Sequence, residues 1–388
     1  MIKYAGQYFR SATAIIEQYD GAIPLAGFLK QYFKANPKFG SKDRRFISQL
    51  CYTYYRAGHS IAATVEEKIK ASVFLCEDNA NEWATLFTDE WLAEWGSSIE
   101  TKWKFISARF PGSDPHKLFL WEDELSKEID PHLFTNSHLL QPDLFLRIRP
   151  GHTKNVSKKL DDKQVVYRRL TETCIALANG TKIEPILAID KEVVVQDLSS
   201  QRVAEFFPPG IPVNVWDCCA ASGGKSLLLH DYIRNINLTV SDVRPSIIRN
   251  LKERFAQAGI RNYDSFIADL TAGGIKIQKQ KFNLIVCDVP CSGSGTWGRT
   301  PEQLCFFSKE KISEYATLQK KIVANVIPYL EKEGYLLYIT CSVFEKENEE
   351  AVTFIQQNSK LTLIKMELLK GYDKKADSMF VALFKLRE

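Results

Sequence analysis

The stretch DCCAASGGKS, residues 217–226, gives the first indication of this chain's architecture. It comes directly after the apolar run IPVNVW, residues 211–216, and ahead of a helical pattern. Its small residues let the backbone turn tightly from a strand into a helix. In open α/β sheets, a glycine-containing turn of this kind lies where nucleotides bind. The stretch therefore predicts a strand–loop–helix unit with a ligand at the loop, and leaves open which ligand.

The sequence after about residue 212 repeats this alternation of strand and helix, which predicts a parallel, doubly wound sheet. The strand-like runs are VNVWD, LTVSD, DSFIAD, LIVCDVP and GYLLYITC. The helical runs cover residues 224–235, 244–259, 309–332 and 345–357. The runs TLIKMEL and MFVALFKL predict a closing pair of strands. Ligands bind beyond the carboxyl ends of parallel strands, where the sequence places Asp217, Asp242, Asp269, Asp288 and Cys341.

The first 125 residues predict a helical domain. Apolar residues recur three and four positions apart in YFRSATAIIEQY and RRFISQLCYTYYRAG. We expect Ser41 to cap the second of these helices, with Asp43 in its first turn. Pro111, Gly112 and Pro115 break the pattern and indicate a boundary. We therefore predict three domains, comprising residues 1–125, a connecting α+β domain at 126–205, and an α/β domain at 206–388.

The connecting domain is rich in basic residues. FLRIRPGHTKN predicts a strand that leads into a turn, whereas KQVVYRRL and TCIAL fit short strands or short helices. The basic residues form either a solvated surface or a face that follows the phosphates of a nucleic acid. They are Arg147, Arg149, Lys154, Lys158, Lys159, Lys163, Arg168 and Arg169.

Composition narrows the class of protein. The chain has 388 residues, a formal net charge of +4 and nine cysteines. No apolar run is long enough to span a membrane, and the start lacks the apolar segment of a signal peptide. We therefore expect a cytoplasmic protein with reduced thiols, which acts as a monomer. The charge permits nucleic-acid binding without requiring it.

The loop does not fit the common phosphate-binding motifs. A P-loop requires G-x-x-x-x-G-K-[ST], but Cys219 occupies the position of the first glycine, and the dinucleotide motif is absent as well. Asp242 and Asp269 are placed to accept hydrogen bonds from ribose hydroxyls and from an adenine amino group. Because carboxylates repel a triphosphate, we expect a phosphate-free adenosyl cofactor, namely S-adenosylmethionine. A P-loop nucleotide hydrolase is the competing hypothesis.

Two cysteines, Cys291 and Cys341, follow the ends of neighbouring predicted strands. Carbon 5 of cytosine is a poor nucleophile until a thiolate adds to carbon 6, so a reactive thiol suits its methylation. We expect Asp288 to hydrogen-bond the base and Lys225 to lower a nearby thiol pKa. Cys51 and Cys287 fit the core. We predict no metal site, since Cys287 and Cys291 lack a second pair of ligands.

These motifs resemble those of the Sun/RsmB family of RNA cytosine-5 methyltransferases. The loop DCCAASGGKS is similar to the family's D-x-C-A-A-P-G-G-K-T, and CDVPCSGSG, TCSVFEKENEE and VQDLSSQRVAEFF resemble further family motifs over residues 193–355. The resemblance implies a Rossmann-like class I methyltransferase domain, a small α+β connecting domain, and an all-α domain that resembles NusB through GSKDRRFISQLCYTYYR.

The resemblance also implies roles for single residues. Cys341 corresponds to the nucleophile, and Cys291 to the cysteine that promotes product release. The positions that correspond to cofactor-binding residues are Cys219, Ala220, Ala221, Ser222, Gly223, Gly224, Lys225, Asp242, Asp269 and Asp288. Two positions depart from the family pattern: Ser222 replaces a proline, and Arg149 stands where the family often has asparagine.

Ribosomal RNA, in particular 16S RNA, is the substrate that the NusB-like resemblance favours. Transfer RNA is an alternative substrate, and a non-catalytic RNA-binding factor in ribosome assembly is an alternative function. If the chain resembled DNA cytosine methyltransferases instead, Cys291 would be the nucleophile.

Overall fold

The computed structural model describes residues 5–80, 83–208, 210, 214–233, 235–272 and 280–387. Val213 and Arg234, which belong to an expected strand and an expected helix, lie outside these residues. The chain forms two compact units. The first comprises Met1–Asp123, Asp130–Gln141 and Thr296–Ser308, and the second Glu124–Ile129, Pro142–Gly295 and Lys309–Glu388. None of the described helices is long and apolar enough to span a membrane.

The first unit is helical, as the sequence predicts. Aromatic side chains fill much of its interior, for example Phe74, whose ring meets the rings of Trp91 and Trp95 at 5.1 and 5.3 Å. Its helices are α1 (Ala5–Gln18), α2 (Leu25–Ala35), α3 (Ser41–Arg56), α4 (Val65–Cys76), α5 (Asp89–Ala93), α6 (Ile99–Arg109), α7 (Pro131–Ser137) and α12 (Gln303–Phe306).

The predicted cap of α3 is wrong by one residue. Gly40 is the capping residue, and Ser41 is the first residue of the helix. The reason lies in Asp43, whose carboxylate accepts a hydrogen bond from the Gly40 amide at 2.8 Å. Asp43 thus satisfies an amide that no helical carbonyl can reach.

A segment from the middle of the α/β sequence joins the helical unit. The Glu302 side chain accepts a hydrogen bond from the Leu25 amide at 3.0 Å, and the Phe306 ring packs against Tyr19 with centroids 5.4 Å apart. Leu304 is fully buried there. The helical periodicity of residues 1–125 could not predict that Thr296–Ser308 belongs to the helical unit.

The second unit contains a seven-stranded sheet with the order β10-β11-β9-β8-β5-β6-β7. The four pairs that link β7, β6, β5, β8 and β9 are parallel, and the two pairs at the β10 edge are antiparallel. This is the predicted doubly wound sheet with its closing pair. The strands are β5 (Asn214–Asp217), β6 (Asn237–Asp242), β7 (Tyr263–Ile267), β8 (Phe282–Asp288), β9 (Leu330–Thr340), β10 (Leu361–Leu369) and β11 (Met379–Leu386).

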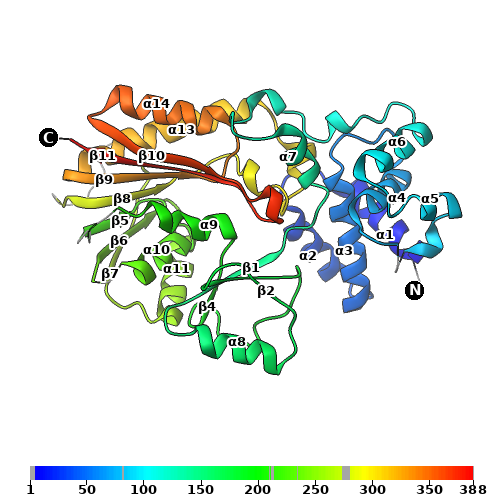
Figure 1. Cartoon of the computed structure of the whole chain (residues 1–388), viewed down its shortest axis with the longest axis horizontal. Helices are drawn as coiled ribbons and strands as arrows, with labels where there is room; N and C mark the ends of the chain where they lie inside the picture. The colour runs from blue at the N-terminus through cyan, green and yellow to red at the C-terminus, as the bar shows by residue number, and fades with distance from the viewer. Residues whose placement is uncertain are drawn as a thin grey trace. The chain divides into compact units, whose positions relative to one another are not determined.

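Helices cover both faces of this sheet (Figure 1). On one face lie α10 (Gly224–Tyr232) and α11 (Pro245–Ala258), and on the other α13 (Glu310–Val326) and α14 (Glu349–Asn358). The predicted helix 309–332 is too long, because α13 ends at Val326 and a 3₁₀ turn (Ile327–Tyr329) leads into β9. Pro328 explains the end, since proline has no amide to donate and its ring disrupts the preceding helical turn.

A smaller antiparallel sheet belongs to the same unit. Its order is β2-β3-β1-β4, and α8 (Thr153–Asp162) packs on it through Val156 and Leu160. Of the two runs that fitted either strands or helices, TCIAL forms β3, whereas only the two arginines of KQVVYRRL are in a strand, β2. The bounds are β1 (Leu144–Ile148), β2 (Arg168–Arg169), β3 (Cys174–Leu177) and β4 (Val193–Val195).

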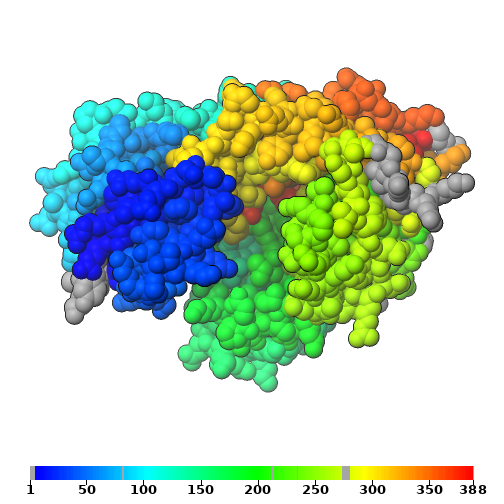
Figure 2. Space-filling view, turned by 180° about the vertical axis from the view of Figure 1, so that it is seen from behind, coloured from blue at the N-terminus to red at the C-terminus, as the bar shows by residue number. Residues whose placement is uncertain are grey.

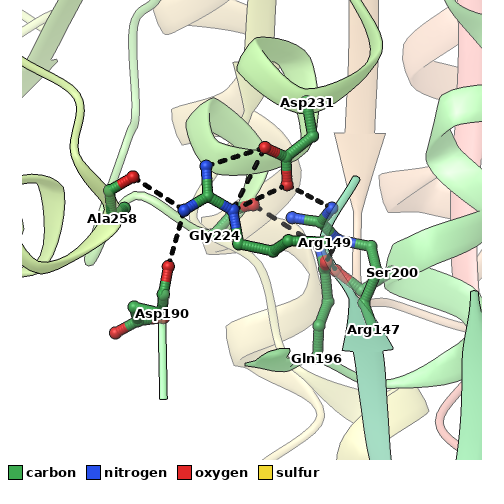
Figure 3. Close-up of polar contacts among 8 residues, drawn as sticks. All are labelled: Arg147, Arg149, Asp190, Gln196, Ser200, Gly224, Asp231 and Ala258. Carbon is green, nitrogen blue, oxygen red and sulfur yellow. Dashed lines mark hydrogen bonds and ion pairs between the residues drawn. The ribbon is translucent and has the colours of Figure 1, made fainter. Parts of the chain in front are cut away.

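Two arginines of the predicted basic face are buried instead (Figure 3). Arg147 and Arg149 both bind the carboxylate of Asp231 on α10, with N–O distances of 2.5 and 2.8 Å. Arg149 also donates to the carbonyls of Asp190 and Ala258 at 2.8 and 2.7 Å. These arginines therefore fix the small sheet to α10 and α11, and they cannot follow the phosphates of a nucleic acid.

Removal of the shared carboxylate should destabilise the second unit. Asp231→Asn leaves two buried guanidinium groups without an anion, and we expect a loss of about 3–5 kcal/mol in the free energy of unfolding. Urea unfolding of the variant and the wild type measures the loss. Asp162→Asn, at an exposed carboxylate of α8, is the control and should lose less than about 0.5 kcal/mol. Equal losses in the two variants would contradict the structural role of Asp231.

Candidate functional site

The candidate site lies at the point where the strand order of the parallel sheet changes direction. After β5 the chain adds β6 and β7 on one side of it, and then adds β8 and β9 on the other side. A cavity of about 470 Å³ opens here at the carboxyl ends of the strands. Figure 2 shows a hollow between the yellow-green surface around residues 240–270 and the yellow-orange surface of α13. Such a switch point is the usual ligand site of open α/β sheets.

Seven of the predicted site residues line this cavity. They are Cys219, Ala221, Asp242, Asp269, Asp288, Cys291 and Cys341. Side chains of α13, including Tyr315, Leu318 and Ile322, form an apolar wall. The volume suits a ligand of nucleoside size.

The other predicted loop residues shape the turn behind the cavity. Gly223 has a φ of +85°, and a Cβ there would lie 2.8 Å from the Phe255 ring, so the position requires glycine. Ala220 donates its amide to the carbonyl of Ser241 at 2.9 Å, which ties the loop to β6. Ser222 accepts weak hydrogen bonds from Arg254 at 3.3 and 3.4 Å, and Gly224 begins α10.

Asp217, at the end of β5, is fully buried below the loop. Burial raises its pKa to about 7, and the nearby Asp288 and Asp242 act in the same direction, whereas the hydrogen bond from Ser226 opposes them. The Ser226 hydroxyl donates to one carboxyl oxygen at 2.5 Å. The other oxygen is buried without a partner, which fits a protonated carboxyl group.

The two outer carboxylates differ in their surroundings. Asp242 is buried and accepts hydrogen bonds from Ala221 and Arg244. Burial favours its neutral form, but the Arg244 hydrogen bonds outweigh this and lower the pKa of Asp242. Asp269 is exposed, and hydrogen bonds from Thr271 lower its pKa. Both groups are therefore ionised acceptors at neutral pH.

Lys225 connects the loop to β8. Its ammonium lies 3.2 Å from a carboxylate oxygen of Asp288 and 2.9 Å from the Ser200 hydroxyl. Its influence on a thiol pKa stays a prediction, because these two contacts join it to a carboxylate and a hydroxyl group. Ser200 was missed by the sequence analysis, although it belongs to the quoted stretch VQDLSSQRVAEFF.

The thiols of Cys291 and Cys341 lie 3.2 Å apart. Cys291 is in the loop after β8, and Cys341 follows the last residue of β9. The Gly295 amide donates to the Cys341 carbonyl at 2.9 Å, which joins the two loops. The hydrogen bond with Cys341, burial and the charge of a Cys341 thiolate raise the pKa of Cys291 well above its ordinary value.

A buried carboxylate behind the thiols was missed by the sequence analysis. Glu347 accepts hydrogen bonds from the Ser292 amide at 2.9 Å, the Ser342 hydroxyl at 2.7 Å and the Gln319 side chain at 2.8 Å. Its two serine partners are the residues directly after Cys291 and Cys341. Glu347 thus fixes both thiol loops against α13. The sequence signal that could have identified Glu347 is the ENE within the quoted run TCSVFEKENEE, of which it is the first residue.

Within the described part of the chain, no group of three or more histidine, cysteine or acidic side chains is arranged to hold a metal ion. The cavity lining combines the carboxylates of Asp242, Asp269 and Asp288 with cysteines that include Cys219, Cys291 and Cys341.

Comparison with known proteins finds similarity to RNA methyltransferases over the part of the chain that holds this site. Residues 212–384 match the family model described as 16S rRNA methyltransferase RsmB/F. The chain is 30% identical over 228 residues to the probable ribosomal RNA small subunit methyltransferase B of Bacillus subtilis (strain 168). That match covers 57% of this chain and 51% of the relative, so the chain spans about half the length of this curated protein.

Solved structures show the same fold at low sequence identity. The crystal structure of PH0851 is 17% identical, covers 97% of this chain and 98% of its own, and gives a TM-score of 0.74. A methyltransferase homolog protein from Pyrococcus horikoshii is 18% identical, covers 68% of this chain and 92% of its own, and gives a TM-score of 0.57. These likenesses support the Rossmann-like architecture.

The buried Asp217 should give stability a characteristic pH dependence. Its pKa is about 7 in the folded state against an ordinary 3.8, so the folded protein holds a proton that the unfolded chain releases. Stability relative to Asp217→Asn should therefore fall as pH rises through this window, by on the order of 3 kcal/mol between pH 5 and pH 8. Urea unfolding of both proteins at the two pH values measures the difference. Asp264→Asn, at an exposed carboxylate on β7, should show no such trend, and an Asp217→Asn difference that is flat with pH would contradict the protonated state.

Proposed function

We propose that this chain, whose residues 212–384 match the family model described as 16S rRNA methyltransferase RsmB/F, is a member of the Sun/RsmB family and methylates carbon 5 of a cytosine in RNA, with S-adenosylmethionine as the methyl donor. The observation that carries this proposal is the pair of thiols 3.2 Å apart at the rim of a cavity lined by carboxylates. Methylation at carbon 5 needs a thiol nucleophile, and a second thiol beside it supplies a proton-transfer group.

The lining of the cavity fits the cofactor. Asp242 would accept the ribose hydroxyls, Asp269 the adenine amino group, and the small residues from Cys219 to Gly224 would border the amino-acid part. Three carboxylates, Asp242, Asp269 and Asp288, line the cavity and would repel the phosphates of ATP, which argues against a P-loop hydrolase. The bound cofactor would supply a methyl group on a positively charged sulfur.

Cys341 is the proposed nucleophile. Its thiolate forms a bond to carbon 6 of the cytosine, which makes carbon 5 nucleophilic. After methylation a base takes the proton from carbon 5, the electron pair of that bond restores the double bond between carbons 5 and 6, the sulfur–carbon 6 bond breaks, and the thiolate of Cys341 is restored. Cys291 is the proposed residue for this release step.

Asp288 and Lys225 would prepare the base for attack. The carboxylate of Asp288 lines the cavity and would hydrogen-bond the polar edge of the cytosine. Lys225, 3.2 Å from Asp288 and held by Ser200, would fix the orientation of that carboxylate. The target cytosine must leave its stack to reach the thiols, which is easiest in a single-stranded or loosened RNA segment.

Ribosomal RNA of the small subunit is the proposed substrate, since the matching family model and the Bacillus subtilis relative both carry that description. We also propose that the protein acts in the cytoplasm as a monomer. A transfer RNA substrate and a non-catalytic role in ribosome assembly are the alternatives that the experiment below has to separate.

The covalent intermediate gives the sharpest test. Wild type, Cys291→Ala and Cys341→Ala are each incubated with S-adenosylmethionine and unmodified 16S RNA or transfer RNA, then run on a denaturing gel. We expect Cys291→Ala to accumulate a protein–RNA adduct with 16S RNA because release is blocked. Cys341→Ala should form no adduct and should lose methyl transfer by at least about a thousandfold.

Cys76→Ala, which removes a half-buried thiol of the helical unit, is the matched control and should retain wild-type methyl transfer. An adduct in Cys341→Ala instead of Cys291→Ala would reverse the two roles. Adduct with transfer RNA alone would change the substrate. Failure of every variant and of the wild type to transfer a methyl group would favour a binding factor.

A further inference from the structure

The guanidinium of Arg244 hydrogen-bonds the carboxylate of Asp242, which is the group proposed to accept the ribose hydroxyls of the cofactor. Its Nε donates to Asp242 Oδ1 at 3.0 Å, and its Nη2 donates to Asp242 Oδ2 at 3.2 Å. Arg244 stands two residues after Asp242, just before α11 begins at Pro245, and it lines the same cavity. The sequence analysis gave this arginine no role.

The carboxylate of Asp242 has no acceptor position left. A carboxylate offers about four lone-pair directions on its two oxygens. The Arg244 amide donates to Oδ1 at 3.0 Å and the Ala221 amide to Oδ2 at 3.2 Å, in addition to the two guanidinium bonds. A ribose diol needs two of these positions, so two of the present donors have to leave.

The four donors differ in how readily they can leave. The Ala221 amide is fixed in the loop between β5 and α10, and the Arg244 amide in the turn between β6 and α11. The guanidinium is at the end of a flexible side chain that is 58% exposed, whereas Asp242 is 7% exposed. Because the guanidinium itself is exposed, water can replace the carboxylate as its partner at small cost.

We propose that the Arg244 guanidinium is a displaceable partner of Asp242, which holds the carboxylate ionised and oriented and is exchanged for the two ribose hydroxyls when the adenosyl cofactor binds. This inference rests on the proposed function, and it makes Arg244 a positioning residue that limits cofactor affinity. The exchange replaces two guanidinium hydrogen bonds with two ribose hydrogen bonds, so the buried carboxylate has four donors both before and after the cofactor binds. An arginine that merely braced the turn before α11 would have the opposite effect on binding.

Calorimetric titration with S-adenosylhomocysteine tests the inference. Since the exposed pair no longer has to be broken, we expect Arg244→Ala to bind about two- to fivefold more tightly than the wild type. The gain should shrink at high salt, where the pair in the wild type is already screened. The 2′,3′-dideoxy analogue of S-adenosylhomocysteine lacks the hydroxyls that would hydrogen-bond Asp242, so Arg244→Ala and the wild type should bind it equally.

Arg249→Ala is the matched control, because it removes an exposed arginine from α11, the helix that Arg244 precedes, and should leave both affinities unchanged. Unchanged or weaker binding of S-adenosylhomocysteine by Arg244→Ala would overturn the inference, as would an equal gain with the dideoxy analogue. Those results leave the proposed function intact as long as the wild type binds. If the folded wild type and all variants fail to bind S-adenosylhomocysteine, the adenosyl site itself is refuted, and the proposed function with it.

Discussion

Parallel pairing of β8 with both β5 and β9 is the constraint on which the candidate site depends. Parallel strands end at the same edge of a sheet, so the loops that follow them converge there. The thiols of Cys291 and Cys341 come from two such loops, and Glu347 fixes both through hydrogen bonds to neighbouring serines. A buried carboxylate with three donors resists displacement, because each donor it lost would remain unsatisfied in the interior. The sheet therefore brings the thiols together, and the Glu347 hydrogen bonds hold them at contact distance.

Periodicity within the sequence was sufficient to predict the sheet, since alternation of apolar strands and helices is a local signal that survives folding. It also placed Asp217, Asp242 and Asp288 at strand ends, because strand order along the chain fixes which edge they share. The sequence failed where a residue's environment depends on a distant partner. Arg147 and Arg149 read as exposed cations, but Asp231, far along the chain, allows both to be buried.

Polar residues between helices posed the same difficulty. The run EKENEE has the composition of a solvated helix end, yet Glu347 and Asn348 are fully buried. Only the tertiary structure supplies the donors that make such burial possible. Likewise, the four acceptor positions of Asp242 can be counted only when Ala221 and Arg244 are seen beside it. The sequence was sufficient to identify Asp242 as a candidate acceptor. Which donors its oxygens already bind depends on how the loops around it fold.

The chain leaves the loop of Cys291 at Gly295 and then contributes Thr296–Ser308 to the helical unit before it returns at Lys309. The helical unit thus consists of three separate pieces of sequence, one of which lies between two segments of the second unit. No single cut in the gene releases an intact copy of either unit. A fragment that began after Gln141 would carry the buried Leu304 without the rest of the helical unit, and Phe306 without the Tyr19 ring against which it packs. Exchange of the helical unit for another domain would therefore require changes at three separate places in the chain.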